Sequence, residues 1–116
     1  MSNYGAKFKA PKISSNAYPG GWTFLKGDSH FVAAATAMVL DHMTQDLHYP
    51  VPSPSSITIH KAGSQIVSGI KVYLEMRLNQ PNMDVQALIY HPSFMLHEQS
   101  SEAKVEKIFI SPKRIF

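Results

Sequence analysis

The chain contains no cysteine among its 116 residues. This absence excludes a thiol nucleophile, a disulfide framework and a zinc site with cysteine ligands. No apolar run is long enough to span a membrane, and residues 1 to 12 contain no hydrophobic segment typical of a signal peptide. We therefore expect a cytoplasmic protein without a membrane partner. A secreted protein whose leader had been removed would show the same features and stays an alternative.

The chain also has few charges, since only 16% of its residues are charged and its formal net charge is +3. A nucleic-acid-binding protein more often concentrates its basic residues on one element, with aromatic residues between them. Here the basic residues gather mostly near the two ends of the chain, at Lys7, Lys9, Lys12, Lys104, Lys107, Lys113 and Arg114. We therefore expect no nucleic-acid partner. The hydrophobic content of 44% is that of one ordinary globular domain.

Motifs for enzymatic chemistry and metal binding are absent as well. The sequence has no Gly-x-Ser-x-Gly, no phosphate-binding loop, no His-Glu-x-x-His and no obvious pair of catalytic carboxylates. Its six histidines lack the spacing of a metal site; His42 and His48, for example, are not four residues apart on one helix. We expect a protein that is not an enzyme and that binds no cofactor or metal.

The first half of the chain predicts an arm and a helix. Residues 1 to 17 are rich in Lys, Ser, Asn and Gly, which is typical of a flexible amino-terminal arm. Tyr18-Pro19-Gly20-Gly21-Trp22 follows as one stiff point and two flexible ones. Asp28 or Ser29 is a suitable N-cap for a helix from His30 to about Gln45. Four apolar residues recur in it at helical spacing, namely Val32, Ala35, Val39 and Met43.

The second half predicts a sheet. In residues 70 to 78 the even positions are apolar and the odd positions polar or amphipathic, so the even set should face a core and the odd set water. On this basis Tyr73, like Tyr90, is expected to be a sheet-surface aromatic. Further strands are predicted at residues 56 to 60, 85 to 90 and 105 to 110, with a short one around residues 22 to 25. The fold class is thus α+β, with one long helix packed across a four- to five-stranded antiparallel sheet.

One segment between two of these strands has an unusual character. Gln65-Ile66-Val67-Ser68-Gly69 ends in a glycine suited to a tight turn with positive φ. Ile66 and Val67 should then lie at or near an exposed hairpin tip, where they cannot stabilise a core. Apolar side chains in such a place favour a surface that a partner buries. An ordinary hairpin is the plainer interpretation of this segment taken alone.

The pattern Gln-x-Val-x-Gly resembles the first binding loop of the cystatins, protein inhibitors of papain-like cysteine proteases. Two further features match this family in order and spacing: Gly20-Gly21 before the helix, and His91-Pro92 between the last two strands. The resemblance covers about residues 18 to 112, so we expect an arm at 1 to 17 and a cystatin-like domain at 18 to 116. The lack of cysteine and the short interval from Gln65 to Pro92 are most similar to the stefins, the cytosolic type 1 branch.

The resemblance implies reversible, non-covalent inhibition of cathepsin-type, papain-like proteases by a three-part wedge in the active-site cleft. Pro19, Gly20 and Gly21 would form its first part, with Tyr18 and Pro19 in a substrate pocket. The residues from Gln65 to Gly69 would form its first loop. The second loop would consist of His91, Pro92, Ser93 and Phe94. Two positions depart from the family: Ser93 follows the proline where many secreted cystatins have Trp, and His91 precedes it where stefins often have Leu. A histidine at the tip would either weaken the apolar contact or make binding sensitive to pH.

Other functions stay open at this level. A cystatin-like domain could bind another protein through the same edge, or through its sheet, without inhibiting a protease. A third interpretation is a small-ligand carrier that uses the space between helix and sheet. Gly20-Gly21 could be only a linker, and Pro92 only a turn residue. We expect a monomer, with a domain-swapped dimer as the alternative.

Overall fold

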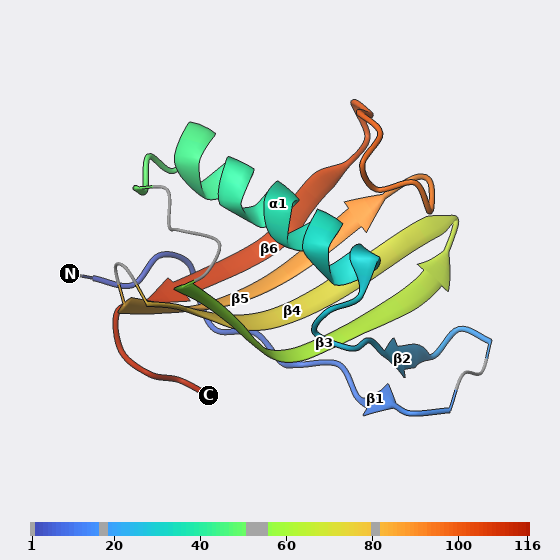
Figure 1. The fold of residues 1–116 in the computed structure, drawn as a ribbon, viewed down its shortest axis with the longest axis horizontal. Helices are drawn as coiled ribbons and strands as arrows, with labels where there is room; N and C mark the ends of the chain where they lie inside the picture. The colour runs from blue at the N-terminus through green and yellow to red at the C-terminus, as the bar shows by residue number, and fades with distance from the viewer. Residues whose placement is uncertain (1, 17–18, 51–55, 80–81) are drawn as a thin grey trace.

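The structure, a computed structural model, describes residues 2–16, 19–50, 56–79 and 82–116. In this part of the chain one helix packs against one face of a six-stranded sheet (Figure 1). The elements are, in chain order, β1 (Ile13–Ser14), β2 (Trp22–Phe24), α1 (His30–Gln45), β3 (Ile57–Val67), β4 (Gly69–Asn79), β5 (Asn82–His91) and β6 (Lys104–Ser111).

The strands lie in the sheet in the order in which they occur in the sequence, from β1 to β6. Neighbouring strands are antiparallel, except that β1 runs parallel to β2. The prediction of an α+β domain with one helix across a largely antiparallel sheet is confirmed. The predicted number of four to five strands is too low, because the segment predicted as an arm contributes β1.

The helix has the predicted bounds and a defined start. Ser29 is its N-cap, and the Ser29 hydroxyl accepts a hydrogen bond from the Phe31 N–H at 3.1 Å. The face toward the sheet carries Val32, Ala35 and Val39, all almost completely buried. Small alanines on the helix let α1 approach the sheet closely, and α1 contacts β4, β5 and β6.

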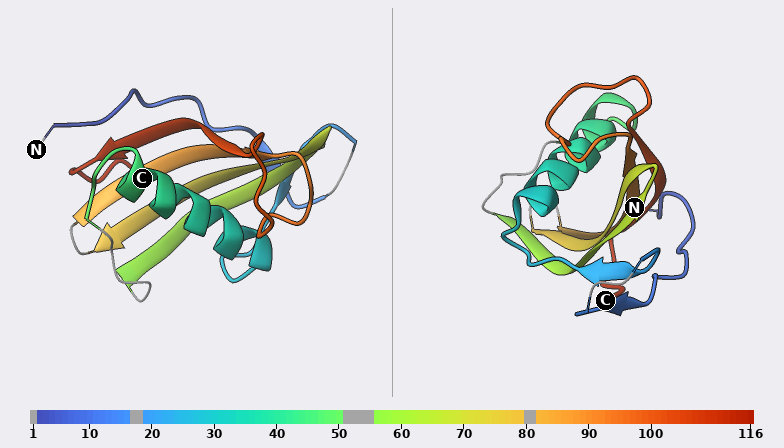
Figure 2. Two further views of the ribbon diagram at one scale, coloured as in Figure 1. Left: turned by 90° about the horizontal axis from the view of Figure 1, so that it is seen from above. Right: turned by 90° about the vertical axis from the view of Figure 1, so that its right-hand side faces the viewer.

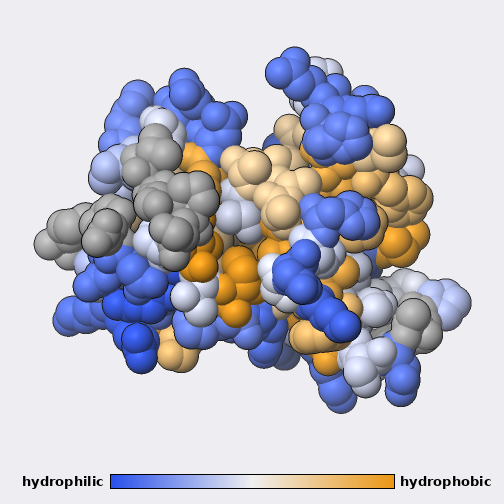
Figure 3. Space-filling model, in the orientation of Figure 1, coloured by the Kyte–Doolittle hydropathy of each residue, from blue (hydrophilic) through white to orange (hydrophobic). Residues whose placement is uncertain are grey.

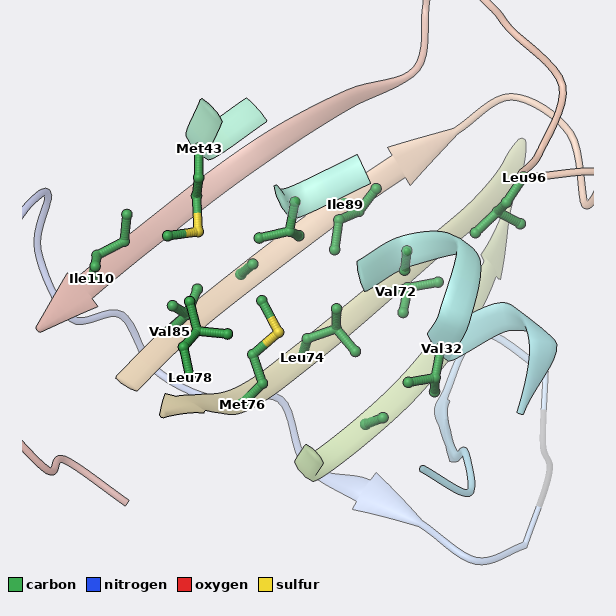
Figure 4. Packing of buried hydrophobic residues seen from close by; sticks show 14 of the residues in the cluster. Val32, Met43, Val72, Leu74, Met76, Leu78, Val85, Ile89, Leu96 and Ile110 are labelled. Atoms are coloured by element: carbon green, nitrogen blue, oxygen red, sulfur yellow. The ribbon is translucent and has the colours of Figure 1, made fainter. Parts of the chain in front are cut away.

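The core lies between this helix and the sheet (Figure 4). The even positions of β4 are buried to 2% exposure or less, as the alternation predicts: Ile70, Val72, Leu74, Met76 and Leu78. Side chains of β5 and β6, such as Val85, Ile89 and Ile110, complete the layer.

Strand β3 is longer than predicted. Residues 56 to 60 were expected to be a strand, whereas pairing with β4 continues to Val67. The register shifts at a β-bulge between Ile59 and Lys61. Before the bulge the partly buried side chains are at odd positions, Ile57 and Ile59, whereas after it the buried Ala62 is at an even position. A strand that changes its phase half-way has no continuous alternation in its sequence, and for this reason its second half was missed.

The amino-terminal segment runs along the face of the sheet opposite the helix (Figure 2). The Phe8 backbone hydrogen-bonds to the side chain of Gln86, and the Phe8 ring meets the edge of the Tyr73 ring. Tyr4 pairs with Ile110 across the edge of β6. This arrangement differs from the flexible arm that we expected. The prediction of Tyr73 as a sheet-surface aromatic was wrong, because Tyr73 is completely buried beneath this segment.

Candidate functional site

The three segments singled out in the sequence lie at one end of the molecule, on the right in Figure 1. The first segment, residues 19 to 21, lies beside the β3–β4 hairpin. The Gln65 side-chain amide donates a hydrogen bond to the backbone oxygen of Gly20 at 2.8 Å. Trp22, the next residue of the chain, pairs directly with Gln65 as β2 runs along β3. The hairpin therefore holds this segment on its carboxyl-terminal side.

The same hairpin contacts the start of the β5–β6 loop. Strand β4 pairs with β5 so that Ile70 lies opposite His91. A Cβ atom added to Gly69 would lie 2.8 Å from Pro92 Cα and would overlap the backbone oxygen of His91. The Tyr90 hydroxyl donates a hydrogen bond to the Ser68 backbone oxygen at 2.8 Å. All three segments are thus joined through one hairpin, and we call them together the three-segment edge: residues 19–21, 65–69 and 91–94.

The turn of the hairpin has the glycine geometry that its sequence predicts. Val67 pairs with Gly69, which leaves Ser68 as the residue of the turn. Gly69 has φ = +110° and Gly20 has φ = +76°, a region that residues with a Cβ rarely adopt. Glycine is required at Gly69 for a second reason, which is the close approach of the β5–β6 loop.

The three-segment edge exposes apolar side chains. Ile66 is 56% exposed and Val67 38%, which confirms the predicted exposed tip. Phe94 on the second loop is 50% exposed. Pro19 and Gly20 are exposed, and Pro92 is partly buried.

The sequence reasoning missed Met95, which is also 50% exposed beside Phe94. Phe94 and Met95 line a hollow against the first turn of α1, next to Phe31. In the view of Figure 3, apolar surface lies where the helix start and this loop meet. The signal for Met95 was the run Phe94-Met95-Leu96 in a loop, of which Leu96 alone is buried.

His91 does not lie at the tip, and that prediction was wrong. It is the last residue of β5, its exposure is 2%, and its ring points inward between the loop and α1. The Ser93 N–H donates to Nδ1 at 3.0 Å, so Nδ1 acts as an acceptor. Nε2 then carries the hydrogen and donates to the Glu98 backbone oxygen at 2.9 Å. The neutral ring holds the β5–β6 loop folded back on itself.

Among the described residues, the two ionisable groups with clear pKa shifts are Tyr73 and Asp84, and both lie away from the three-segment edge. Burial alone would raise the pKa of Asp84, but hydrogen bonds from the Ile115 N–H and from Arg77 outweigh it and lower that pKa. Arg77 Nη1 lies 2.7 Å from Asp84 Oδ1, and this pair ties the carboxyl end of the chain to β4 and β5. Burial and the hydrogen bond to Glu75 raise the pKa of Tyr73, which keeps it a neutral donor.

The described residues contain neither a candidate metal site nor a membrane-spanning helix. No group of three or more His, Asp or Glu residues is placed to hold a metal ion within residues 2–16, 19–50, 56–79 and 82–116. In the same part of the chain, no helix has both the length and the apolar character that crossing a membrane requires.

Comparison with known proteins gives no relative for this chain: no family model, no curated protein and no solved structure matches it. The interpretation of the three-segment edge therefore rests on its own geometry and chemistry.

Proposed function

We propose that this chain is a reversible, non-covalent inhibitor of papain-like cysteine proteases, with a cystatin-like fold closest to the stefins. The observation that carries the proposal is the convergence of three segments far apart in the sequence on one apolar edge. Gly20 meets Gln65, and Gly69 meets Pro92, through the contacts described above. A wedge that enters a protease cleft needs this arrangement. If Gly20-Gly21 were only a linker, Pro92 only a turn residue and Gln65 to Gly69 only an ordinary hairpin, the three segments would have no reason to meet.

The order of the elements supports the same proposal. The first segment precedes β2 and α1, the first loop joins β3 to β4, and the second loop joins β5 to β6. This is the order in which the cystatin pattern places its glycine-bearing segment and its two hairpins. Strand β1 and the covered outer face are additions at the amino-terminal side of that pattern.

The physical character of the edge suits tight association. The sheet already holds Val67 and Pro92 in place, so little conformational entropy is lost when they are buried. Most of the binding energy in such interfaces comes from a few apolar anchors at the centre. Ile66, Val67 and Phe94 are the exposed apolar candidates for these anchors. His91 supports the second loop from inside, and Pro92, Ser93 and Phe94 remain to make the contact.

The mechanism needs no reaction of the chain with the protease. The hairpin tip and the second loop would cover the catalytic cysteine and exclude substrate, while residues 19 to 21 turn the backbone away from it. Because no peptide bond has to be cleaved and no covalent bond forms, activity returns when the complex dissociates.

The test compares two aspartate substitutions on the same strand. Val67→Asp places a charge at the hairpin tip, where the complex would desolvate it, and should weaken papain inhibition at least about 100-fold. Thr58→Asp places the same charge at an exposed position near the other end of β3 and should leave inhibition unchanged. Both variants should remain folded by circular dichroism. Equal inhibition by Val67→Asp and the wild-type chain would show that the hairpin is not the contact, and would favour a module that binds another protein.

A further inference from the structure

The chain on the amino-terminal side of the three-segment edge is attached to the sheet. Ile13 and Ser14 form β1 and pair with Trp22 and Thr23 of β2. Along the chain, Pro19, Gly20 and Gly21 therefore lie between two neighbouring strands of the same sheet. The chain is attached to the sheet both before and after these residues, whereas a free tail is attached at one end only.

A second attachment lies further back, at Phe8. The Gln86 side chain accepts a hydrogen bond from the Phe8 N–H at 3.1 Å and donates one to the Phe8 backbone oxygen at 2.7 Å. The same Gln86 amide donates to the Tyr73 hydroxyl at 2.8 Å, and Tyr73 donates to Glu75 at 2.6 Å. Gln86 and Tyr73 are buried, so this polar network is satisfied only while Phe8 stays in place.

Two glycines allow the amino-terminal segment to lie close against the sheet. Gly63 of β3 lies beneath Ile13, whose Cγ1 and Cδ1 atoms are 2.9 Å and 2.7 Å from the place where a Cβ of residue 63 would lie. Gly5 passes so close to the Ile108 backbone oxygen that a side chain at Gly5 would overlap it. Tyr4 exchanges two backbone hydrogen bonds with Ile110, at 2.9 Å and 3.0 Å.

We propose that residues 4 to 14 form an amino-terminal strap that positions residues 19 to 21 for protease binding. This role rests on the proposed function. The strap converts the first part of the wedge from a tail into an anchored loop, with Gly20 held against Gln65. A tail must be ordered when the complex forms, and the entropy lost in that step weakens binding. Here the strap orders residues 19 to 21 before the protease binds. We expect this ordering to act chiefly by slowing the dissociation of the complex.

The test weakens the attachment of the strap with one substitution and then restores the attachment with an engineered disulfide. Phe8→Ala removes the ring that meets Tyr73 and leaves the core between helix and sheet untouched. The double substitution Ile13→Cys and Gly63→Cys introduces the only two cysteines of the chain. From the positions of the Ile13 side-chain atoms, their Cβ atoms would lie about 3.5 Å apart, at the lower end of the separations that a disulfide spans. Phe8→Tyr is the conservative control.

Two readouts are compared. Amide hydrogen exchange at Trp22 and Thr23 reports whether the loop is held, without any protease. Dissociation from papain, activated and then freed of reductant, reports the effect on binding. We expect Phe8→Ala to speed both exchange and dissociation about tenfold or more. We expect Phe8→Tyr to resemble the wild-type chain, and the oxidised disulfide in the Phe8→Ala background to restore both rates.

The failures can be told apart. If the wild-type chain inhibits papain and Phe8→Ala changes neither rate, the strap does not position the loop. If Phe8→Ala speeds dissociation but the disulfide restores only the exchange rates, the strap acts on stability and not through residues 19 to 21, and the proposal is likewise overturned. If the wild-type chain does not bind papain, the proposed function fails together with the positioning role, whatever the exchange rates show.

Discussion

Substitution of Gly69 by alanine should disrupt the junction between the hairpin and the β5–β6 loop. Two effects add at this position. The first is backbone strain, because φ is +110° and alanine rarely adopts such a value. The second is steric: the new Cβ would overlap the His91 backbone oxygen and would lie 2.8 Å from Pro92 Cα and 3.0 Å from Pro92 C. These are backbone atoms of paired and packed segments, so they cannot move aside as the end of a flexible side chain could.

The magnitude follows from the two effects. A strained φ of this kind destabilises by roughly 1–3 kcal/mol, and forcing an extra methyl group into a packed site adds roughly 1–3 kcal/mol. We therefore expect Gly69→Ala to lower the free energy of unfolding by about 2–6 kcal/mol. With a urea dependence of about 1–2 kcal/mol/M for a domain of this size, the middle of that range lowers the unfolding midpoint by about 3 M.

Gly20→Ala is the matched control for this prediction. Gly20 also has a positive φ, +76°, but no heavy atom lies within 4 Å of the place where its Cβ would be. Its substitution should show the strain alone, about 1–2 kcal/mol. Urea unfolding can be followed by the fluorescence of Trp22, the one tryptophan of the chain. If Gly69→Ala and Gly20→Ala destabilised equally, the hairpin and the second loop would not be in contact, and the three-segment edge would not exist.

Three further predictions concern the rest of the domain. Thr36→Val should stabilise it by about 1 kcal/mol in urea unfolding, because the Thr36 hydroxyl is a buried group without a hydrogen-bond partner among the described residues; a loss of stability would mean that the hydroxyl is satisfied. Arg77→Leu should destabilise by about 3 kcal/mol, since it leaves the buried Asp84 carboxylate without its cation, and a change below about 1 kcal/mol would contradict the pair. Because the folded pKa of Asp84 is lowered, its stabilisation is fully present above about pH 4 and is lost as the pH falls through that folded pKa. The Asp84→Asn variant should therefore lose less stability than the wild-type chain between pH 5 and pH 2, and parallel pH profiles would refute this.

The sequence predicted those elements whose pattern is continuous. The helix from His30 to Gln45 has a cap, helical spacing and no Pro or Gly, and the structure has it at the same bounds. The alternation along β4 is unbroken, and its even positions are buried as expected. The alternating pattern of strand β3 is interrupted at the bulge after Ile59, where the inward-facing side chains change from odd to even positions.

The parts that were not predicted depend on contacts between distant residues. Most of residues 2 to 16 are exposed, as a polar composition indicates, but this composition contains no sign of Gln86, which lies 78 residues from Phe8 and binds its backbone. Tyr73 has an odd position on β4 and is buried on the face of the sheet where the Phe8 ring packs against it. The place of His91 next to Pro92 suggested a tip, whereas its hydrogen bond to Glu98 draws the ring inward.

The most direct test of the central claim is a titration of papain with the purified wild-type chain, with hydrolysis of a small peptide substrate as the readout. We expect a saturable loss of activity that reverses on dilution, as a non-covalent wedge in the cleft requires. Undiminished hydrolysis at high micromolar concentrations of the folded chain would contradict the account.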